Sequence, residues 1–475
     1  MGQGNAFARI FTMLAACAAA GCDHSSSDDA DNGARPVLAA FNAVPDLQDV
    51  TFLREEEVWS SIAYGVGTDF RSVDADQYDV KFDSRLPGDE TTSCSGDLDR
   101  DGVKDTNECT RLVSQSINVL KDHEYVVALV GRYGAASIKV YDDAVHTFDS
   151  RTDDGDGADL NAQVQFFNWS AQLGTFDVYL EPPGTNLSAT QVKAALAPGN
   201  EYLGFADEGS YVLTLSAVAN PNAPIYTSET FKIDKRTRVA LAILDGTSDS
   251  TSAVKVARFR DQGGDLFDRR VKTLMRVAHV APDAGNLDVF AEEDYTAPLF
   301  ANLTLKQSTP YIEIPPTVGS ELELDITPAG NVGVLLTREQ ASLTKGERAT
   351  FFLVKSSNGG VDGFKASDTA RRLAPYAQLR LVSSVTQSLD FYVIPHGNNV
   401  FTSGVTQTLS SASVGSSQTF EPGTYDVVIA RAGTDTFVFG PREVQMAADG
   451  IYTVVAVPTV QTTRADVLLL DDFTL

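Results

Sequence analysis

The fold of this chain is decided by the stretch Met275-Arg-Val-Ala-His-Val-Ala-Pro282-Asp283, which is followed by Leu287-Asp-Val-Phe290. Apolar and polar residues alternate in both segments, and the Pro-Asp pair separates them as a turn. The same order stands near the start of the chain, in Val37-Leu-Ala-Ala-Phe-Asn-Ala-Val-Pro45-Asp46 and Val50-Thr-Phe-Leu53, with the same interval from the Asp to the second segment. This alternation predicts strands that pack one face and expose the other.

The opening recurs about every 100 residues, so the chain consists of four copies of one module. The second copy reads Val164-Gln-Phe-Phe-Asn-Trp169 and Phe176-Asp-Val-Tyr179, and the fourth reads Leu379-Arg-Leu-Val-Ser-Ser384 and Leu389-Asp-Phe-Tyr392. Both keep the hydrophobic pattern and lack the Pro-Asp turn. The repeat therefore lies in the strands rather than in any one polar residue.

Two further strands are expected later in each copy. One follows a turn, and the other is apolar without alternation, which predicts a central strand buried on both faces. The turn-fed strands lie at 76–80, 208–213, 319–324 and 423–427, and the apolar ones at 125–130, 239–244, 351–354 and 452–457. About seven short strands per hundred residues is typical of a β-sandwich. We predict an all-β chain of four tandem immunoglobulin-like β-sandwich domains, at 36–148, 160–268, 273–370 and 375–475.

The N-A-x-P-D-x-x-x-V-D-V-Y opening, with its later G-x-Y-x-V and Y-x-V-V-A-V strands, resembles the bacterial domain-of-unknown-function family 4397. The third copy is the closest match and the first copy is next. The resemblance implies tandem domains in a secreted or lipid-anchored bacterial protein. Because its motifs are a turn and strands, and because the family carries no settled activity, it implies fold and location far more than function.

The N-terminus has the features of a targeting segment. An apolar run at 10–20 follows Arg9, and it is shorter than the roughly 20 residues of a membrane-spanning helix. It ends in Ala19-Ala20-Gly21-Cys22, which resembles the lipobox of bacterial lipoproteins, although the first of these positions is usually Leu. The resemblance implies a signal peptide at 1–21 and lipidation of Cys22. The alternative is an ordinary secretory signal with an incidental cysteine.

The segment that follows, residues 22–35, is small, polar and acidic, and predicts a flexible tether. Such a tether spans roughly 20 Å. We expect an exported protein, periplasmic or on the cell surface, that is anchored by lipid to the inner or the outer membrane. Asp23 after the cysteine would retain an enterobacterial lipoprotein at the inner membrane, but that rule does not hold in all bacteria.

Charge limits the possible partners. The chain has 64 acidic and 37 basic residues and a formal net charge of −27, so phosphate groups would be repelled and nucleic acid is excluded. The expected partners are the membrane, through the N-terminal lipid, and a glycan or protein ligand.

One stretch has the spacing of a calcium loop. Its carboxylates occupy loop positions 1, 3, 5, 9 and 12, with a glycine at position 6. Calcium takes six to eight oxygen ligands, one of them a main-chain carbonyl at position 7. The predicted ligands are Asp97, Asp99, Asp101, Val103, Asp105 and Glu108. We therefore predict calcium as a structural cofactor of the first domain.

Two cysteines flank this loop, and in an exported protein Cys94 and Cys109 are expected to form a disulfide. Closing a loop of about 16 residues stabilises a fold by about 3 kcal/mol. The flanks are not helical and Lys104 replaces the usual hydrophobic residue, so the loop resembles the disulfide-flanked calcium repeats of thrombospondin type 3. The alternative is an acidic insertion held by a disulfide. A second acidic stretch at 149–159 lacks ligand spacing and is interpreted as a linker.

No catalytic motif of the H-E-x-x-H, G-x-S-x-G or phosphate-loop type occurs in the sequence. His279 takes the place of Asn42 beside the turn and is interpreted as a structural hydrogen-bonding residue. Asp177 and Asp288 are interpreted as outward-facing polar residues of strands. We predict that the protein is not an enzyme but a lipid-anchored structural, adhesive or ligand-binding stalk in the cell envelope. The alternative is an envelope hydrolase or another enzyme with its site in the loops at a sandwich end.

Overall fold

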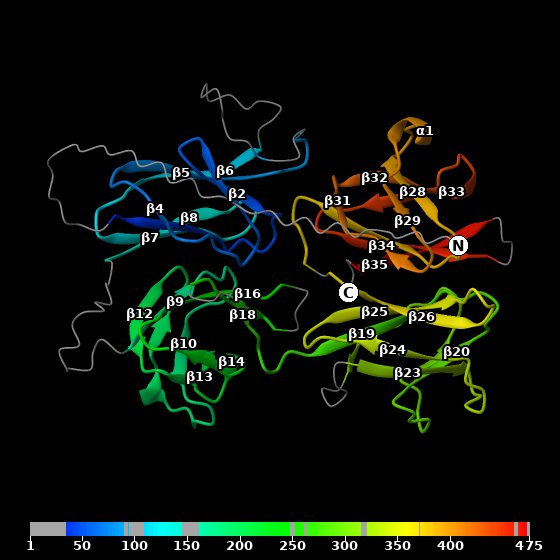
Figure 1. Ribbon diagram of the computed structural model, residues 1–475, viewed down its shortest axis with the longest axis horizontal. Helices are drawn as coiled ribbons and strands as arrows, with labels where there is room; N and C mark the ends of the chain where they lie inside the picture. Colours follow the sequence, from blue (N-terminus) through cyan, green and yellow to red (C-terminus); the bar gives the residue numbers. More distant parts are fainter. Residues whose placement is uncertain are drawn as a thin grey trace, which may run out of the picture. The chain divides into compact units, whose positions relative to one another are not determined.

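In the described residues, strands paired into two-layered sandwiches make up nearly all of the regular structure (Figure 1). The computed structural model describes residues 35–89, 94, 109–144, 161–247, 252–260, 264–314, 321–369, 371–459 and 464–472. The chain from Arg35 onward forms one compact unit. The prediction of an all-β chain of tandem sandwiches is confirmed.

The first two sheet pairs are called sandwich 1 and sandwich 2. Sandwich 1 pairs a first sheet of order β4-β1-β7-β8 with a second sheet of order β3-β2-β5-β6. Its strands are β1 (Val37–Asn42), β2 (Val50–Arg54), β3 (Glu57–Ile62), β4 (Arg71–Ser72), β5 (Gln77–Ser84), β6 (Thr110–Asn118), β7 (His123–Val130) and β8 (Ser137–Ala144). In sandwich 2 the sheets are β12-β9-β16-β17-β18 and β11-β10-β13-β14, with β15 also on β13. Its elements are β9 (Ala162–Asn168), β10 (Phe176–Glu181), the 3₁₀ turn η2 (Ala189–Gln191), β11 (Ala194–Leu196), β12 (Glu201–Ala206), β13 (Gly209–Ala217), β14 (Pro224–Thr227), β15 (Phe231–Ile233), β16 (Arg238–Asp245), β17 (Val254–Arg258) and β18 (Gly264–Leu266).

Sandwiches 3 and 4 repeat this plan. The sheets of sandwich 3 are β22-β19-β25-β26 and β21-β20-β23-β24. Its strands are β19 (Thr273–His279), β20 (Leu287–Ala291), β21 (Phe300–Leu303), β22 (Ile312–Ile314), β23 (Glu321–Pro328), β24 (Thr337–Ser342), β25 (Arg348–Lys355) and β26 (Val361–Ser367). Sandwich 4 has β30-β27-β34-β35, with β31 also on β27, and β29-β28-β32-β33. Its elements are β27 (Ala377–Ser383), β28 (Leu389–Pro395), α1 (Val400–Ser403), β29 (Gln407–Leu409), β30 (Ser413–Val414), β31 (Gln418–Phe420), β32 (Gly423–Arg431), β33 (Phe437–Met446), β34 (Ile451–Pro458) and β35 (Ala465–Asp471).

The first strand of every sandwich runs parallel to the late apolar strand, in the pairs β1–β7, β9–β16, β19–β25 and β27–β34. Their registers set Asn42 opposite Leu129, Asn168 opposite Ile243, His279 opposite Leu353 and Ser383 opposite Ala456. These four pairs fix which residues are equivalent in the four copies. They also confirm that the late strands are central.

Each sandwich holds its own apolar core between its two sheets. In sandwich 1, Leu38 of β1 packs in one cluster with Phe52 of β2 and Phe82 of β5, and all three side chains are fully buried. Alternate residues of each strand point into this cluster because successive side chains of a strand face opposite ways. The alternation of the early strands therefore predicted the core correctly.

The late apolar strands are buried on both faces because a second sandwich covers the outer face. In β7, Tyr125, Val127 and Leu129 belong to the core of sandwich 1. The residues between them join a cluster with the equivalent residues of β16, namely Val126, Ala128 and Val130 with Ala240, Ala242 and Leu244. Phe352 and Val354 of β25 meet Val455 and Val457 of β34 in the same way. Equivalent surfaces that meet each other make an isologous interface, so sandwich 1 pairs with 2 and sandwich 3 with 4.

Buried ion pairs repeat this symmetry between sandwiches 3 and 4. Arg276 of β19 donates two hydrogen bonds, of 2.6 and 3.1 Å, to Asp472 after β35. Its equivalent Arg380 of β27 donates one of 2.5 Å to Asp368 after β26. Each Arg is three residues before the end of its strand, and each Asp follows the last strand of the opposite sandwich. The two contacts are therefore reciprocal.

Aromatic residues and a shared carboxylate hold sandwiches 1 and 2 together. The Trp169 ring lies 4.7 Å from Phe41 and 5.6 Å from Phe259, and its Nε1 donates a 2.7 Å hydrogen bond to Tyr141 Oη. At another part of the interface, Glu124 of sandwich 1 forms ion pairs with two arginines of sandwich 2, Arg238 and Arg260. This interface thus combines aromatic packing with ion pairs.

Candidate functional site

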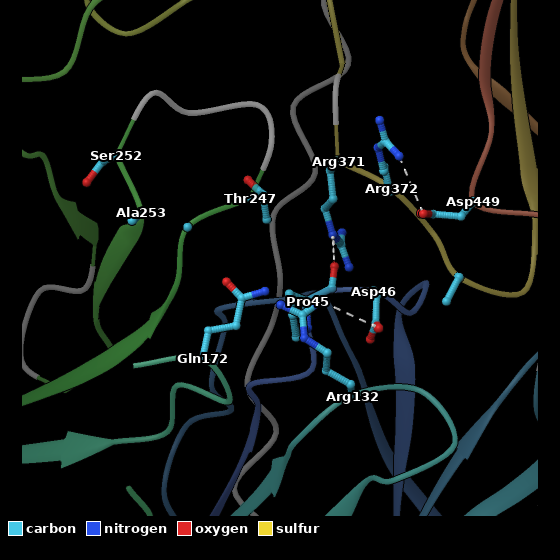
Figure 2. A pocket seen from close by; sticks show the side chains of 12 residues that line it. Pro45, Asp46, Arg132, Gln172, Thr247, Ser252, Ala253, Arg371, Arg372 and Asp449 are labelled. Atoms are coloured by element: carbon cyan, nitrogen blue, oxygen red, sulfur yellow. Dashed lines mark hydrogen bonds and ion pairs between the residues drawn. The ribbon is translucent and has the colours of Figure 1, made fainter. Parts of the chain in front are cut away.

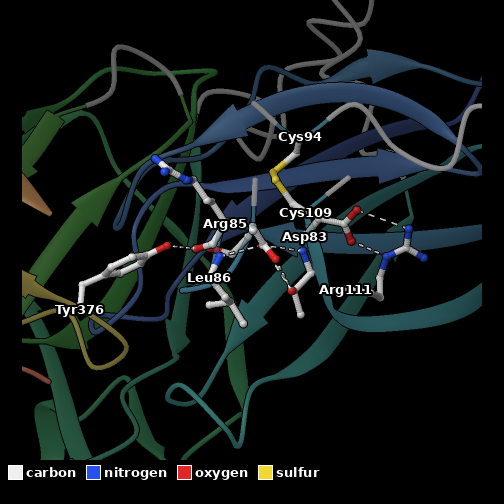
Figure 3. The surroundings of a disulfide bond; sticks show 10 residues. Asp83, Arg85, Leu86, Cys94, Cys109, Arg111 and Tyr376 are labelled. Atoms are coloured by element: carbon white, nitrogen blue, oxygen red, sulfur yellow. Dashed lines mark hydrogen bonds and ion pairs between the residues drawn. A yellow bond between two sulfur atoms is a disulfide. The ribbon is translucent and has the colours of Figure 1, made fainter. Parts of the chain in front are cut away.

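A disulfide closes the base of the loop between β5 and β6 (Figure 3). These two strands are antiparallel neighbours, so the chain leaves the second sheet at Ser84 and returns at Thr110 beside it. Cys94 and Cys109 are bonded, with their Cα atoms 5.0 Å apart. The predicted disulfide is present.

Two carboxylates near the disulfide form hydrogen bonds and an ion pair that hold the two ends of this loop. Asp89 accepts hydrogen bonds from the main-chain N–H groups of Leu86 and Thr110, at 2.9 and 3.1 Å. Asp83 is buried and pairs with Arg111. Burial raises the pKa of Asp83, and the bond with Arg111 acts in the opposite direction. These groups position the two ends of the loop.

The predicted ligand residues cannot be placed in the same way. Asp97, Asp99, Asp101, Val103, Asp105 and Glu108 lie outside the described residues, as does the predicted lipidation site Cys22. Within the ranges that the structure describes, no three His, Cys, Asp or Glu side chains come together as metal ligands. In those same ranges no helix is both long and apolar enough to cross a bilayer.

The polar residue that ends the first strand holds the turn that follows it. Asn42 donates to Ile62 O at 3.1 Å and accepts from Val44 N at 3.0 Å. His279 is fully buried, accepts from Ala281 N at 3.3 Å and faces Gly285 O at 2.9 Å, so its Nε2 carries the hydrogen. Burial lowers the pKa of His279. The interpretation of His279 as a structural hydrogen-bonding residue is confirmed.

The aspartates of the second strands face away from the cores of their sandwiches, as the sequence predicted, but they are not exposed to solvent. Asp177, Asp288 and Asp390 are buried. Each accepts a hydrogen bond from the main chain just after the third strand of its sheet, from Ala219 N at 2.7 Å, Gly330 N at 2.8 Å and Gly433 N at 2.7 Å. A buried carboxylate needs such donors. These residues therefore fix the loop between the third and fourth strands.

A cavity of about 560 Å³ lies where the Pro45-Asp46 turn meets parts of sandwiches 2 and 4 (Figure 2). Its guanidinium groups are engaged. Arg132 pairs with Asp245 at 3.0 Å, Arg371 donates to Pro45 O at 2.9 Å and Arg372 lies 3.6 Å from Asp449. The cavity is a polar junction in which Arg132 and Arg372 face carboxylates and Arg371 donates to main-chain carbonyl groups. Sequence reasoning missed it because its residues come from distant segments.

The segment before β27 closes this junction. Ala374 N donates to Asp46 O at 2.8 Å, and Tyr376 Oη donates to Arg85 O at 3.0 Å (Figure 3). The Pro-Asp turn of sandwich 1 thus accepts hydrogen bonds from the side chain of Arg371 and the main chain of Ala374, more than 300 residues later. In sandwich 3 the equivalent Asp283 pairs instead with Lys355, at 3.0 Å.

Comparison with known proteins supports the expected family resemblance for one segment of the chain. The model of a family described as "Domain of unknown function (DUF4397)" matches residues 273–392. This range covers sandwich 3 and continues into β27 and β28, and it supports one domain of that family in the chain. No curated protein matches the chain. Among solved structures, the Bacillus anthracis TIE protein is similar at 8% identity and a TM-score of 0.14, over 88% of this chain and 66% of that chain. This chain therefore spans slightly less than two thirds of that protein.

Proposed function

We propose that this chain is a non-enzymatic, lipid-anchored protein of the cell envelope. In this proposal, tandem domains of one family form a structural or adhesive, ligand-binding body, and calcium stabilises the first domain. The proposal rests on the role of the polar residues that recur at equivalent positions of the sandwiches. Asn42, His279 and Asp288 bind the main chain of turns, whereas a general acid or base must reach a substrate.

The paired sandwiches support a role as a rigid body. Two apolar interfaces join the sandwiches, and each also contains ion pairs, partly buried between sandwiches 1 and 2 and buried between sandwiches 3 and 4. A surface that is already ordered loses less entropy when it binds a partner. A stalk or adhesive module of this kind needs stiffness rather than reactive groups.

The calcium site is proposed for the loop that the disulfide closes. The bond between Cys94 and Cys109 brings the two ends of the acidic segment together. Asp97, Asp99, Asp101, Asp105 and Glu108 would supply carboxylate oxygens and Val103 a carbonyl oxygen. Extracellular modules of this type bind calcium at about 10⁻⁴ to 10⁻³ M, so the ion would be structural.

Thermal unfolding of the oxidised protein in EDTA and in millimolar calcium tests this site. Calcium at about ten times its dissociation constant adds about 1.4 kcal/mol to the first domain. We expect one transition to move upward, and the variant Asp99→Ala/Asp101→Ala to lose that shift. The matched control is Asp153→Ala/Asp154→Ala in the second acidic stretch, which should keep it. An equal calcium response in both double variants would refute the loop as the site.

Lipid anchoring is tested separately, in cells. We expect the native chain to incorporate a labelled fatty acid and to fractionate with membranes, and the Cys22→Ser variant to do neither. If the Cys22→Ser variant is still labelled, a residue other than Cys22 carries the lipid, and the proposed lipidation site is wrong.

A further inference from the structure

The loop that joins β23 to β24 in sandwich 3 exposes a cluster of aliphatic side chains. This loop, residues 329–336, reads Ala-Gly-Asn-Val-Gly-Val-Leu-Leu and is called the apolar loop. Its exposed side chains are Val332 (52%), Leu335 (47%), Val334 (44%) and Leu336 (37%). No charged residue lies between Asp325 and Arg338, although 21% of the chain is charged. Exposed apolar patches of this kind mark interaction sites.

Hydrogen bonds hold the apolar loop in an ordered turn. Gly330 N donates to the buried Asp288 at 2.8 Å, and Leu336 N donates to Ile326 O at 2.9 Å. Gly330 has φ +72°, which suits a residue without a side chain. Because the two ends are fixed, the aliphatic side chains stay directed away from the core of sandwich 3.

The other sandwiches show that the turn itself does not require apolar residues. The equivalent loops of sandwiches 2 and 4, at 218–223 and 432–436, are held by Asp177 and Asp390 in the same way. They contain mainly small and polar residues, such as Asn, Thr and Asp. In sandwich 1 the disulfide-closed loop takes this place. The apolar content is therefore particular to sandwich 3.

A neighbouring turn adds a further aliphatic side chain at the same end of sandwich 3. Strand β20 begins at Leu287, which pairs with Leu303 of β21 on one side and with Pro328 of β23 on the other. Leu305, two residues after β21, is 44% exposed. The end of the sandwich thus presents aliphatic groups from two loops.

We propose that the apolar loop inserts into the interfacial region of a bilayer whose headgroups carry no net negative charge. The loop lacks the Trp, Tyr, Met and Arg residues that anchor most protein interfaces. The net charge of −27 opposes contact with anionic lipid. The inference rests on the proposed anchoring and deepens it, because the apolar loop adds a membrane contact on a folded domain to the lipid at Cys22.

The test uses residues 22–475 with Cys22→Ser, so that no lipid is attached, and sedimentation with phosphatidylcholine vesicles at millimolar lipid. We expect binding that Val334→Asp/Leu335→Asp weakens about tenfold. The matched control is Val218→Asp in the equivalent loop of sandwich 2, which should bind like the parent. Thermal unfolding of each variant confirms that it is folded. Vesicles with phosphatidylglycerol should bind the parent less.

A second measurement places the loop itself. In Leu335→Trp, brominated phosphatidylcholine should quench the new tryptophan. The proposal is overturned if parent and double variant bind vesicles equally, if neither binds, or if the double substitution abolishes self-association in solution instead. These outcomes do not depend on whether Cys22 is lipidated in cells, so the two proposals fail separately.

Discussion

Removing one carboxylate from the interface between sandwiches 3 and 4 should destabilise that pair alone. Asp472 is the target, because its side chain is 9% exposed and that of its partner Arg276 is 5% exposed. In Asp472→Ala the guanidinium stays buried, with Thr350 Oγ1 as a hydrogen-bond acceptor at 2.7 Å and the centre of the Tyr311 ring at 4.7 Å. Burial lowers the pKa of Arg276, but the hydrogen bond with Asp472 and the charges of Asp472, Tyr311 and Asp368 together leave it raised.

The magnitude follows from that burial. Breaking a buried ion pair by removing one partner costs about 3–5 kcal/mol. Because Thr350 still accepts a hydrogen bond, we expect the lower end, about 3 kcal/mol. The matched control is Asp466→Ala, whose partner is Lys306 and whose side chain is 41% exposed. An exposed pair of this kind contributes about 1 kcal/mol or less.

Urea unfolding followed by far-UV circular dichroism measures the effect. A loss of about 3 kcal/mol lowers the midpoint by roughly 1 M or more when the slope is about 1–3 kcal/mol per M. Trp59 and Trp169 both lie in sandwiches 1 and 2, so the tryptophan fluorescence transition should stay in place. Asp472→Leu combined with Arg276→Met should recover much of the loss. If Asp472→Ala lowers the urea midpoint no more than Asp466→Ala does, the reasoning that the Arg276–Asp472 pair is buried and costly to break is refuted.

Two further predictions concern the other interface and the repeated turn. Ala128→Glu places a charge in the apolar contact between sandwiches 1 and 2, and we expect the emission of the buried Trp169 to shift to longer wavelength; an unchanged spectrum would contradict the interface. His279→Leu leaves the N–H of Ala281 and the carbonyl of Gly285 without their partner and should cost about 1–3 kcal/mol in thermal unfolding, whereas His279→Asn, the residue of sandwiches 1 and 2, should cost less. Because the pKa of His279 is lowered in the fold, the unfolded chain binds the proton first, so stability should fall as the pH drops below about 6.5, and His279→Asn should remove this part of the pH dependence.

The strands and their order along the chain were predictable from periodicity. Alternation identified the early strands, and the apolar runs identified β7, β16, β25 and β34 as central. The sequence could not say what covers the outer face of these runs, because a strand buried by a helix or by another sheet has the same pattern. A signal existed in Arg276 and Arg380, which interrupt apolar first strands at equivalent positions. An arginine there requires a buried partner.

Polar residues were harder to interpret than apolar ones. His279 and Asn42 could be read from their place beside a turn. Asp177 and Asp288 were assigned to the correct face, but alternation does not show that a later loop will cover that face and bury them. For the calcium loop, the disulfide between Cys94 and Cys109 is present, and the ligand set remains a prediction from spacing.

The reciprocal ion pairs also contribute to the specificity with which the sandwiches pair. Four similar sandwiches on one polypeptide can dock with the wrong neighbour during folding, a common failure of tandem repeats. If sandwich 1 took the place of sandwich 4, Ala39 would stand where Arg380 stands, and the buried Asp368 would lose its guanidinium. Such a mismatch leaves a charge desolvated and unpaired, which disfavours the wrong partner. The reciprocal ion pairs thus favour the pairing of sandwich 3 with sandwich 4 over pairing with another sandwich.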